Sequence, residues 1–301
     1  MSAQVQPPER ADGAPLVVVE NLRVLLPTGD RSKVEAVRRV DLVIRDGERI
    51  GIVGESGSGK SVTGRSIAGL LPTSPRVEVS GSIRFGGREM IGAPASAWEA
   101  IRREHVGMIF QDPLTFLNPT MRIRRQVAES IPRGREGSEA ARREAVLRFL
   151  QQAGLDDAEQ VAASFPHELS GGMRQRVLIA IAIAKLPSLI IADEPTTALD
   201  ATVQKRVLHT LDKTVSELRT SLILISHDLA VVSAMTDRIY VMYAGRIVEE
   251  GPTARVMREP QHPYTQALLR SVRSLIDPDT ELYSIPPSLR RELAAEVRDA
   301  P

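Results

Sequence analysis

The sequence contains no cysteine, so it has neither a disulfide nor a thiolate metal site. It also lacks an apolar run long enough to cross a bilayer, which needs about 20 residues. The most apolar run covers residues 177–184 and is stopped by Lys185, so we expect a helix buried in a protein core. Positive and negative side chains nearly balance, and the net charge of +1 therefore gives no argument for a nucleic-acid partner.

The composition is that of a globular protein with room for a sizeable core. Hydrophobic residues make up 42% of the 301 positions and charged residues 26%, and this length allows two domains. Residues 1–14 are rich in proline, alanine and charge, so we expect a disordered lead-in rather than a signal peptide. We predict one main domain over residues 15–255 and a C-terminal extension over residues 256–301.

Residues 54–61 fit the phosphate-loop pattern G-x-x-x-x-G-K-[S/T]. A short apolar strand precedes them and a helix pattern over residues 62–71, ended by Pro72, follows, which is the context that the motif requires. Glycines let several backbone N–H groups point at one anion, Lys60 can reach the β- and γ-phosphates, and the Ser61 hydroxyl can ligate Mg²⁺. The predicted nucleotide-binding residues of this loop are Gly54, Glu55, Ser56, Gly57, Ser58, Gly59, Lys60, Ser61 and Val62.

Strand and helix patterns alternate along most of the chain, which predicts an α/β fold. Strands over residues 16–26 and 34–44, separated by a Pro-Thr-Gly-Asp turn, indicate an antiparallel β subdomain. The fully apolar strands over 189–193 and 222–226 are typical of a parallel sheet covered on both faces. Residues from about 115 to 170 are Arg-rich and helical in pattern. The expected fold is a P-loop NTPase core with a mainly parallel sheet, an antiparallel β subdomain and a helical insertion.

An acidic pair ends the apolar strand over residues 189–193. Asp193 can hold the coordination shell of Mg²⁺, and Glu194 can polarise the attacking water as a general base. Asp-Glu-Pro could also be a plain strand-ending turn, but the phosphate loop upstream favours a nucleotide hydrolase.

A second anion-binding segment lies far from the first in the sequence. Ser170 is a good N-cap, and Gly171 and Gly172 open the backbone at the start of a helix. One triphosphate does not need two such loops in one chain, whereas two copies arranged head to tail would use both. We therefore expect Ser170, Gly171 and Gly172 to bind, in trans, the ATP of a partner.

With these motifs the chain resembles the ATP-binding subunits of ABC transporters, from about residue 16 to residue 275. Residues 169–173 resemble the family's signature sequence, with Met173 where glutamine is more usual. The resemblance implies that Gln111 contacts ATP and Mg²⁺ and senses the membrane subunits. It also implies that His227 contacts the γ-phosphate.

The resemblance extends the predicted site. It implies that residues 198–200 meet a partner cassette. The expected catalytic residues are Lys60, Glu194 and His227, and the expected Mg²⁺ ligands are Ser61, Gln111 and Asp193. ATP and Mg²⁺ are the implied substrate and cofactor.

Three segments narrow the resemblance to importers of oligopeptides, dipeptides and nickel: residues 110–119, 166–176 and 262–269. His262-Pro263-Tyr264 is particular to that group, although as a pattern it is also simply a helix begun by proline. The extension over 256–301 is accordingly expected to be of the oligopeptide-importer type. Some relatives carry a Cys-rich metal cluster there, which this chain cannot form.

One departure concerns the nucleotide base. The family often stacks adenine on an aromatic side chain shortly after the first strand, where this chain has Leu25 and Leu26. We therefore expect apolar contact in place of stacking and weak discrimination between bases.

The resemblance implies the ATP-hydrolysing subunit of an ABC importer for peptides or a related small solute. A cassette in a soluble, non-transport enzyme complex, such as one for phosphonate breakdown, stays open as an alternative. ABC proteins acting on DNA or ribosomes usually show coiled-coil inserts or two cassettes, and neither is visible here. A P-loop kinase would not explain residues 170–173 or His227.

The implied partners follow from the same resemblance. They are a second ABC ATPase subunit (a homologous heterodimer rather than a homodimer is favoured), two integral-membrane permease subunits and, indirectly, an extracytoplasmic solute-binding protein. No nucleic-acid partner is expected. We expect a peripheral protein on the cytoplasmic face of the cell membrane.

Overall fold

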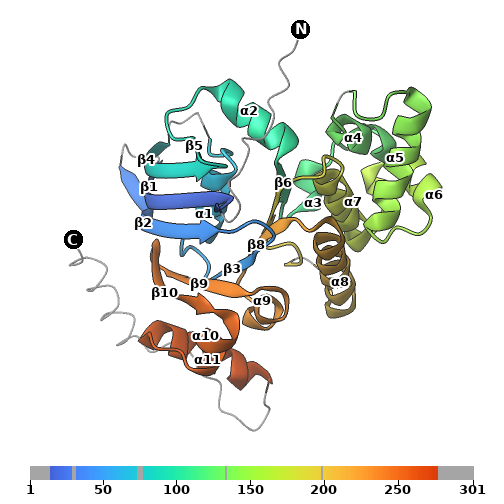
Figure 1. Ribbon diagram of the computed structural model, residues 1–301. Helices are drawn as coiled ribbons and strands as arrows, with labels where there is room; N and C mark the ends of the chain where they lie inside the picture. The colour runs from blue at the N-terminus through green and yellow to red at the C-terminus, as the bar shows by residue number, and fades with distance from the viewer. Residues whose placement is uncertain (1–13, 29–31, 73–76, 133, 198, 277–301) are drawn as a thin grey trace. The chain divides into compact units, whose positions relative to one another are not determined.

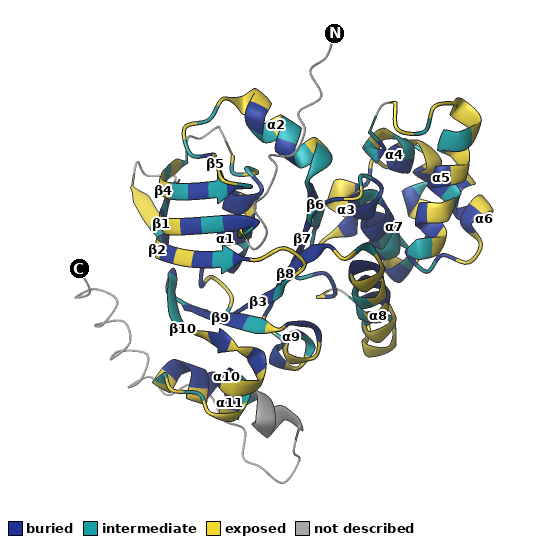
Figure 2. Ribbon diagram, viewed as in Figure 1, coloured by how far each residue is buried: buried dark blue, intermediate teal, exposed yellow. Residues whose placement is uncertain are grey.

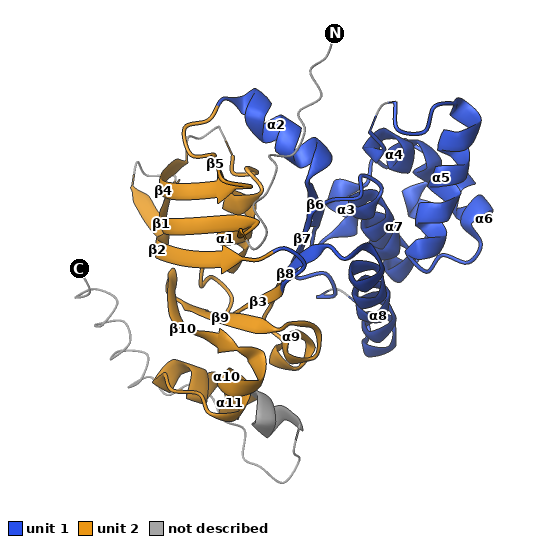
Figure 3. Cartoon of the chain, in the orientation of Figure 1, with its two compact units in different colours: residues 1–5, 46–48, 94–223 blue, residues 6–45, 49–93, 224–301 orange. Residues whose placement is uncertain are grey.

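The computed structural model describes residues 14–28, 32–72, 77–132, 134–197 and 199–276 (Figure 1). The predicted lead-in thus lies almost wholly outside the described residues. The chain forms two compact units, one built mainly from residues 94–223 and the other from the segments before residue 93 and after residue 224 (Figure 3).

An antiparallel sheet forms one part of the second unit, with the strand order β2-β1-β4-β5. Its strands are β1 (Val17–Pro27), β2 (Lys33–Ile44), β4 (Glu78–Phe85) and β5 (Arg88–Glu89). Val17 pairs with Ile44 on one side and with Phe85 on the other. Buried and exposed residues alternate along β1 because one face of the sheet lies on the core (Figure 2). The antiparallel β subdomain is confirmed.

The rest of the second unit carries the phosphate loop. Strand β3 (Arg49–Val53) pairs in parallel with β9 (Arg238–Tyr243), and β9 pairs in antiparallel with β10 (Arg246–Pro252). Strand β8 (Ser221–Ser226) is the other neighbour of β3, and its last three residues belong to this unit. The helices of this part are α1 (Lys60–Ile67), α9 (Leu229–Met235), α10 (Thr253–Arg258) and α11 (Pro263–Ile276).

In the first unit, β6 (Val106–Ile109) pairs in parallel with β7 (Leu189–Asp193). Helix α2 (Ala95–Glu104) precedes β6, and α7 (Gly171–Ile183) and α8 (Ala201–Leu218) flank β7 in sequence. The apolar run of α7 is almost entirely buried, as the sequence predicted. The helical insertion contains α3 (Pro113–Phe116), α4 (Ile123–Ser130), α5 (Glu139–Gln152), α6 (Ala158–Ala163) and a 3₁₀ turn (Pro166–Glu168).

One helix boundary differs from the sequence-based expectation. The helix after the phosphate loop starts at Lys60 and ends at Ile67, short of the predicted end at residue 71. Gly69 adopts φ +63°, and its N–H donates to the Ser66 carbonyl, so a left-handed glycine ends the helix before Pro72 is reached. The predicted domain boundary after residue 255 falls inside α10, and it stays a prediction.

Candidate functional site

The phosphate loop connects buried β3 to α1. Gly59 is the N-cap of α1 with φ +103°, in the left-handed region that favours glycine. A Cβ on Gly59 would lie 2.4 Å from the Ala36 carbonyl oxygen, and one on Gly54 would lie 2.1 Å from that of Met242. Backbone from β2 and β9 therefore presses on the loop from outside and allows only glycine there. Around Gly57 nothing lies within 4 Å of such a Cβ, so this side of the loop is open.

The Lys60 side chain is hydrogen-bonded to the backbone of the phosphate loop. Its side chain is 4% exposed, and its ammonium group donates to the carbonyl oxygens of Gly54 and Glu55, each at 2.8 Å. The Ser58 hydroxyl is buried and finds no hydrogen-bond partner within the described residues. A glycine loop that is open around Gly57, a tethered cation and an unsatisfied buried hydroxyl fit a polyphosphate anion.

The backbone of Glu55 has a role that the sequence did not indicate. Its N–H donates to the Tyr264 hydroxyl at 2.9 Å, so this donor is already satisfied by the protein. A contact between Glu55 and a nucleotide would have to use another atom. His227 directly follows β8, the neighbour of β3, and its side chain is exposed.

The acidic pair of the first unit lies at the end of β7. Asp193 is 2% exposed, whereas Glu194 is half-buried and adopts φ +48°. That backbone conformation is uncommon for a residue with a side chain and often occurs at functional sites. The Thr197 hydroxyl donates to the Glu194 carboxylate at 2.7 Å, a positioning contact that the motif alone did not reveal.

The register of the sheet brings two predicted residues to one edge. Ile109 of β6 pairs with Ala192 of β7, so Gln111 and Asp193 both follow at the carboxyl end of this parallel pair. Gln111 is exposed. The buried Gln175 side chain of α7 donates to the carbonyl oxygen of Phe110 at 3.1 Å, which ties α7 to the residue before Gln111.

The signature segment begins α7. Ser170 is its N-cap, and the hydroxyl accepts a hydrogen bond from the Met173 N–H at 3.3 Å, as the sequence predicted for a capping serine. Gly172 has a packing reason that the sequence did not give: a Cβ there would lie 2.2 Å from Val203 of α8. Ser170 and Gly171 are exposed and Gly172 is buried, so only the first two of the three predicted positions are open to a ligand.

The segment expected to meet a partner cassette, residues 198–200, directly precedes α8. Asp200 caps α8 by accepting from the N–H groups of Thr202 and Val203, while Ala198 lies outside the described residues. The described part of the chain holds no group of three or more His, Asp or Glu that could bind a metal. Within the same ranges, no helix combines the length and apolar character needed to cross a membrane.

Fold and phosphate loop together define an ABC-type ATPase, and the ABC transporter family matches residues 37–197. The chain therefore belongs to the ABC transporter family and is an ATP hydrolase. A second match, over residues 248–296, is to the oligopeptide/dipeptide transporter C-terminal region. The α/β P-loop fold with its helical insertion is thus confirmed, as is the resemblance to the peptide-importer group.

Among sequence relatives, the chain is similar to the oligopeptide transport ATP-binding protein OppD of Salmonella typhimurium. The two are 44% identical over 271 residues, which cover 90% of this chain and 80% of that protein. OppD of Bacillus subtilis is 42% identical over 272 residues, covering 90% of this chain and 76% of the relative.

Solved structures support the same conclusion. A dimeric ATP-binding cassette in a post-hydrolysis state, bound to ADP and Pi, gives a TM-score of 0.69 at 30% identity and covers 79% of this chain and 98% of its own. The cbiO1 protein of Clostridium perfringens, part of an ABC transporter complex, gives 0.67 at 27% identity, covering 81% and 91%.

The base of the nucleotide should be recognised weakly. Leu25 and Leu26 are half-buried at the end of β1, where the family often has an aromatic residue. Stacking on an aromatic ring contributes roughly 1–3 kcal/mol, which apolar contact alone does not supply. In a competition titration, ATP and GTP should bind within about tenfold of each other, and Leu25→Tyr or Leu26→Tyr should tighten the binding of both. A preference for ATP above about a hundredfold would show that another aromatic residue provides the platform.

Proposed function

We propose that this chain is the ATP-hydrolysing subunit of an importer that takes up peptides or a related small solute through partner permeases. The match of residues 248–296 to a region named for oligopeptide/dipeptide transporters carries the proposal, because it joins an ABC ATPase to a peptide-transport segment in one chain. The relatives named for oligopeptide transport support the same substrate class.

The proposed reaction transfers the γ-phosphoryl group of ATP to water. Backbone N–H groups of the loop over residues 54–62, with the exception of the Glu55 N–H, bind the phosphates together with the Lys60 ammonium. His227 contacts the γ-phosphate, so negative charge on the transferred group is stabilised. Glu194 accepts the proton of the attacking water. The oxygen atoms that would hold Mg²⁺ are the hydroxyl of Ser61, the side-chain amide oxygen of Gln111 and the carboxylate of Asp193. The bound ion would neutralise charge on the β- and γ-phosphates.

The proposed active unit contains two cassettes. The exposed Ser170 and Gly171 at the start of α7 form a second anion-binding helix end, for which one chain has no second phosphate loop. A partner cassette, preferably a homologous but different one, would supply the ATP that they contact. A solute-binding protein outside the cell would deliver the solute to the permeases, which places this subunit on the cytoplasmic face of the membrane.

A groove in the helical insertion is the surface proposed for the permeases. It encloses about 790 Å³ between α4, α5 and α6. Its lining contains four arginines and two glutamates: Arg124, Arg125, Arg142, Arg143, Glu139 and Glu159. Its excess of positive charge suits an acidic permease segment. Nearby along the chain, Leu114 and Phe116 of α3 are 58% and 45% exposed, which adds an apolar contact surface.

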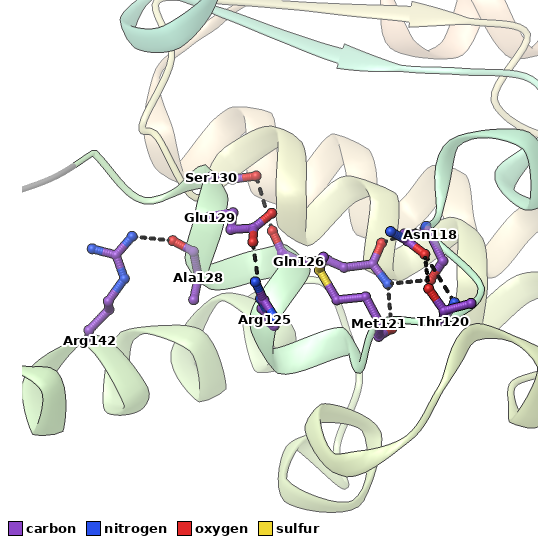
Figure 4. A network of polar contacts seen from close by, with 9 residues as sticks. All are labelled: Asn118, Thr120, Met121, Arg125, Gln126, Ala128, Glu129, Ser130 and Arg142. Atoms are coloured by element: carbon purple, nitrogen blue, oxygen red, sulfur yellow. Dashed lines mark hydrogen bonds and ion pairs between the residues drawn. The ribbon is translucent and has the colours of Figure 1, made fainter.

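Part-buried polar contacts connect the segments of this insertion (Figure 4). The buried Gln126 side chain accepts from the Asn118 N–H at 2.9 Å and donates to the carbonyls of Asn118 and Met121 at 3.0 and 2.8 Å. The Arg142 guanidinium donates to the carbonyl oxygen of Ala128 near the end of α4 (Figure 4). It also donates to the carbonyl oxygen of Ile131 at 2.9 Å. These bonds fix the loop before α4 and the α4–α5 connection, so a docked partner meets a preformed surface.

Reversing charge in the groove should release the subunit from the membrane. We expect Arg124→Glu combined with Arg143→Glu to lower the membrane-bound fraction at least about tenfold in cells that contain the permeases, because acidic partner groups would then be repelled. ATPase activity of the isolated subunit should stay within about twofold. Fractionation followed by an ATPase assay provides the measurement.

Arg88→Glu, an exposed reversal on β5, is the matched control and should still sediment with membranes. Groove variants that sediment normally would exclude this docking surface. Wild-type protein that stays in the soluble fraction beside its permeases would instead favour the non-transport complex.

A further inference from the structure

The C-terminal segment contacts the phosphate loop directly through one hydrogen bond. Tyr264 is the second residue of α11 and is fully buried, and its hydroxyl accepts from the Glu55 N–H at 2.9 Å. The ring packs against Tyr243 at the end of β9, with centroids 4.6 Å apart and an interplanar angle of 47°. Packing therefore fixes the ring, and the hydroxyl is aimed at the first peptide group of the loop.

The backbone of Glu55 makes a second hydrogen bond, which involves Lys60. While the N–H of Glu55 donates to Tyr264, its carbonyl oxygen accepts from the Lys60 ammonium at 2.8 Å. The preceding carbonyl, that of Gly54, accepts from Lys60 as well. Tyr264 thus holds the backbone segment whose carbonyls position the lysine expected to bind the phosphates.

The start of α11 is anchored independently of the loop. The Glu249 carboxylate on β10 accepts from the N–H groups of Gln261, at 2.9 Å, and His262, at 3.0 Å. Burial tends to raise the pKa of Glu249, but these hydrogen bonds lower it overall, so the group is charged at neutral pH. The Tyr264 N–H donates to Nδ1 of His262 at 3.1 Å. The His262-Pro263-Tyr264 element is thereby fixed to the sheet that carries the phosphate loop.

We propose that Tyr264 is a positioning residue for ATP binding: through the Glu55 peptide group, its hydroxyl sets the conformation of the phosphate loop and of Lys60. This inference rests on the proposed role of residues 54–61 as the nucleotide site. It gives the C-terminal element a task in nucleotide binding that is separate from solute choice and from permease docking.

The test is Tyr264→Phe in the full-length chain, since this change keeps the ring and removes only the hydroxyl. The Glu55 N–H then loses the Tyr264 hydroxyl as its acceptor, and we expect the Kd for Mg-ATP to rise roughly 5- to 30-fold, the lower part of the range for losing one hydrogen-bond partner, because this bond is only partly buried. KM for ATP should rise more than kcat falls. Hydrogen exchange of peptides covering residues 54–60, without nucleotide, should accelerate about tenfold.

Tyr240→Phe is the matched control, because it removes another tyrosine hydroxyl that bonds backbone in the same unit. Tyr240 is 1% exposed, and its hydroxyl lies 3.2 Å from both the N–H and the carbonyl oxygen of Val43 on β2. The Tyr240→Phe variant should lower the unfolding midpoint about as much as Tyr264→Phe does, while its Kd for ATP should stay within twofold of the wild-type value.

The possible results distinguish the positioning role of Tyr264 from the nucleotide site itself. An unchanged Kd and unchanged exchange in Tyr264→Phe, or an equal rise in Kd in Tyr240→Phe, would overturn the positioning role while wild-type binding still supports the nucleotide site. Loss of ATP binding in Lys60→Ala supports that site separately. Wild-type protein that binds no Mg-ATP would overturn both.

Discussion

Glu194→Gln should retain ATP binding and slow hydrolysis by roughly 10²–10⁴-fold, the usual effect of removing a general base. An amide has the shape of the carboxylate but cannot take the proton of the attacking water. The loss corresponds to about 3–5 kcal/mol of activation free energy. Steady-state ATPase rates and a nucleotide-binding titration on the purified variant provide the measurement.

Lys60→Ala provides the opposite pattern, because it removes the cation tethered to the carbonyls of Gly54 and Glu55. That variant should lose productive binding, whereas Glu194→Gln should lose only the chemical step. Near-normal turnover in Glu194→Gln would refute the assignment of the base. The hydrogen bond from Thr197 suggests a milder variant, Thr197→Val, which should lower the rate less because the carboxylate itself remains.

Ser170→Arg should abolish ATPase activity and ATP-dependent dimerisation while the affinity of the monomer for ATP stays within a few-fold. The arginine would fill the space at the exposed start of α7, where the γ-phosphate of the partner's ATP is expected. The contacts of residues 54–61 are made within one chain and should survive. Titration, size-exclusion chromatography with ATP, and ATPase assays separate these effects.

Mixing Ser170→Arg protein with Lys60→Ala protein tests whether the site is shared between chains. In a symmetric dimer, one of the two sites combines an intact Lys60 with an intact partner Ser170, so activity should partly return. If this chain pairs with a different cassette, the mixture should stay inactive until that cassette is added. Normal hydrolysis by Ser170→Arg in every context would contradict binding in trans.

Local patterns predicted the parts of the fold that depend on local chemistry. The phosphate loop and the acidic end of β7 were recognisable because strand, turn and helix signals follow one another within a few residues. The end of α1 was misplaced because Gly69 and Pro72 both stop helices, and the nearer glycine acts first. A sequence pattern identifies the helix, but it does not show which of two nearby helix-ending residues ends it.

Contacts between residues far apart in the chain could not be predicted from the sequence. Tyr264 and Glu55 lie 209 positions apart, and nothing in His-Pro-Tyr indicates which backbone group its hydroxyl will meet. Gly172 was predicted from its helix-opening backbone, yet the close approach of Val203 explains it at least as well. A glycine required by packing and a glycine required by an anion look alike in a single sequence.

The bond between Gln175 and the Phe110 carbonyl has a thermodynamic consequence for the proposed transporter. Helix α7 spans 13 residues, about 20 Å, and carries Ser170 at one end, while Gln175 joins it to the residue before Gln111. A shift of the Gln111 segment would pull on this bond and thereby on the helix that carries the serine expected to meet the partner's ATP. Coupling between two binding equilibria is reciprocal. If a permease favours closure of the dimer by some free energy, then closure of the dimer by ATP strengthens permease binding by the same free energy.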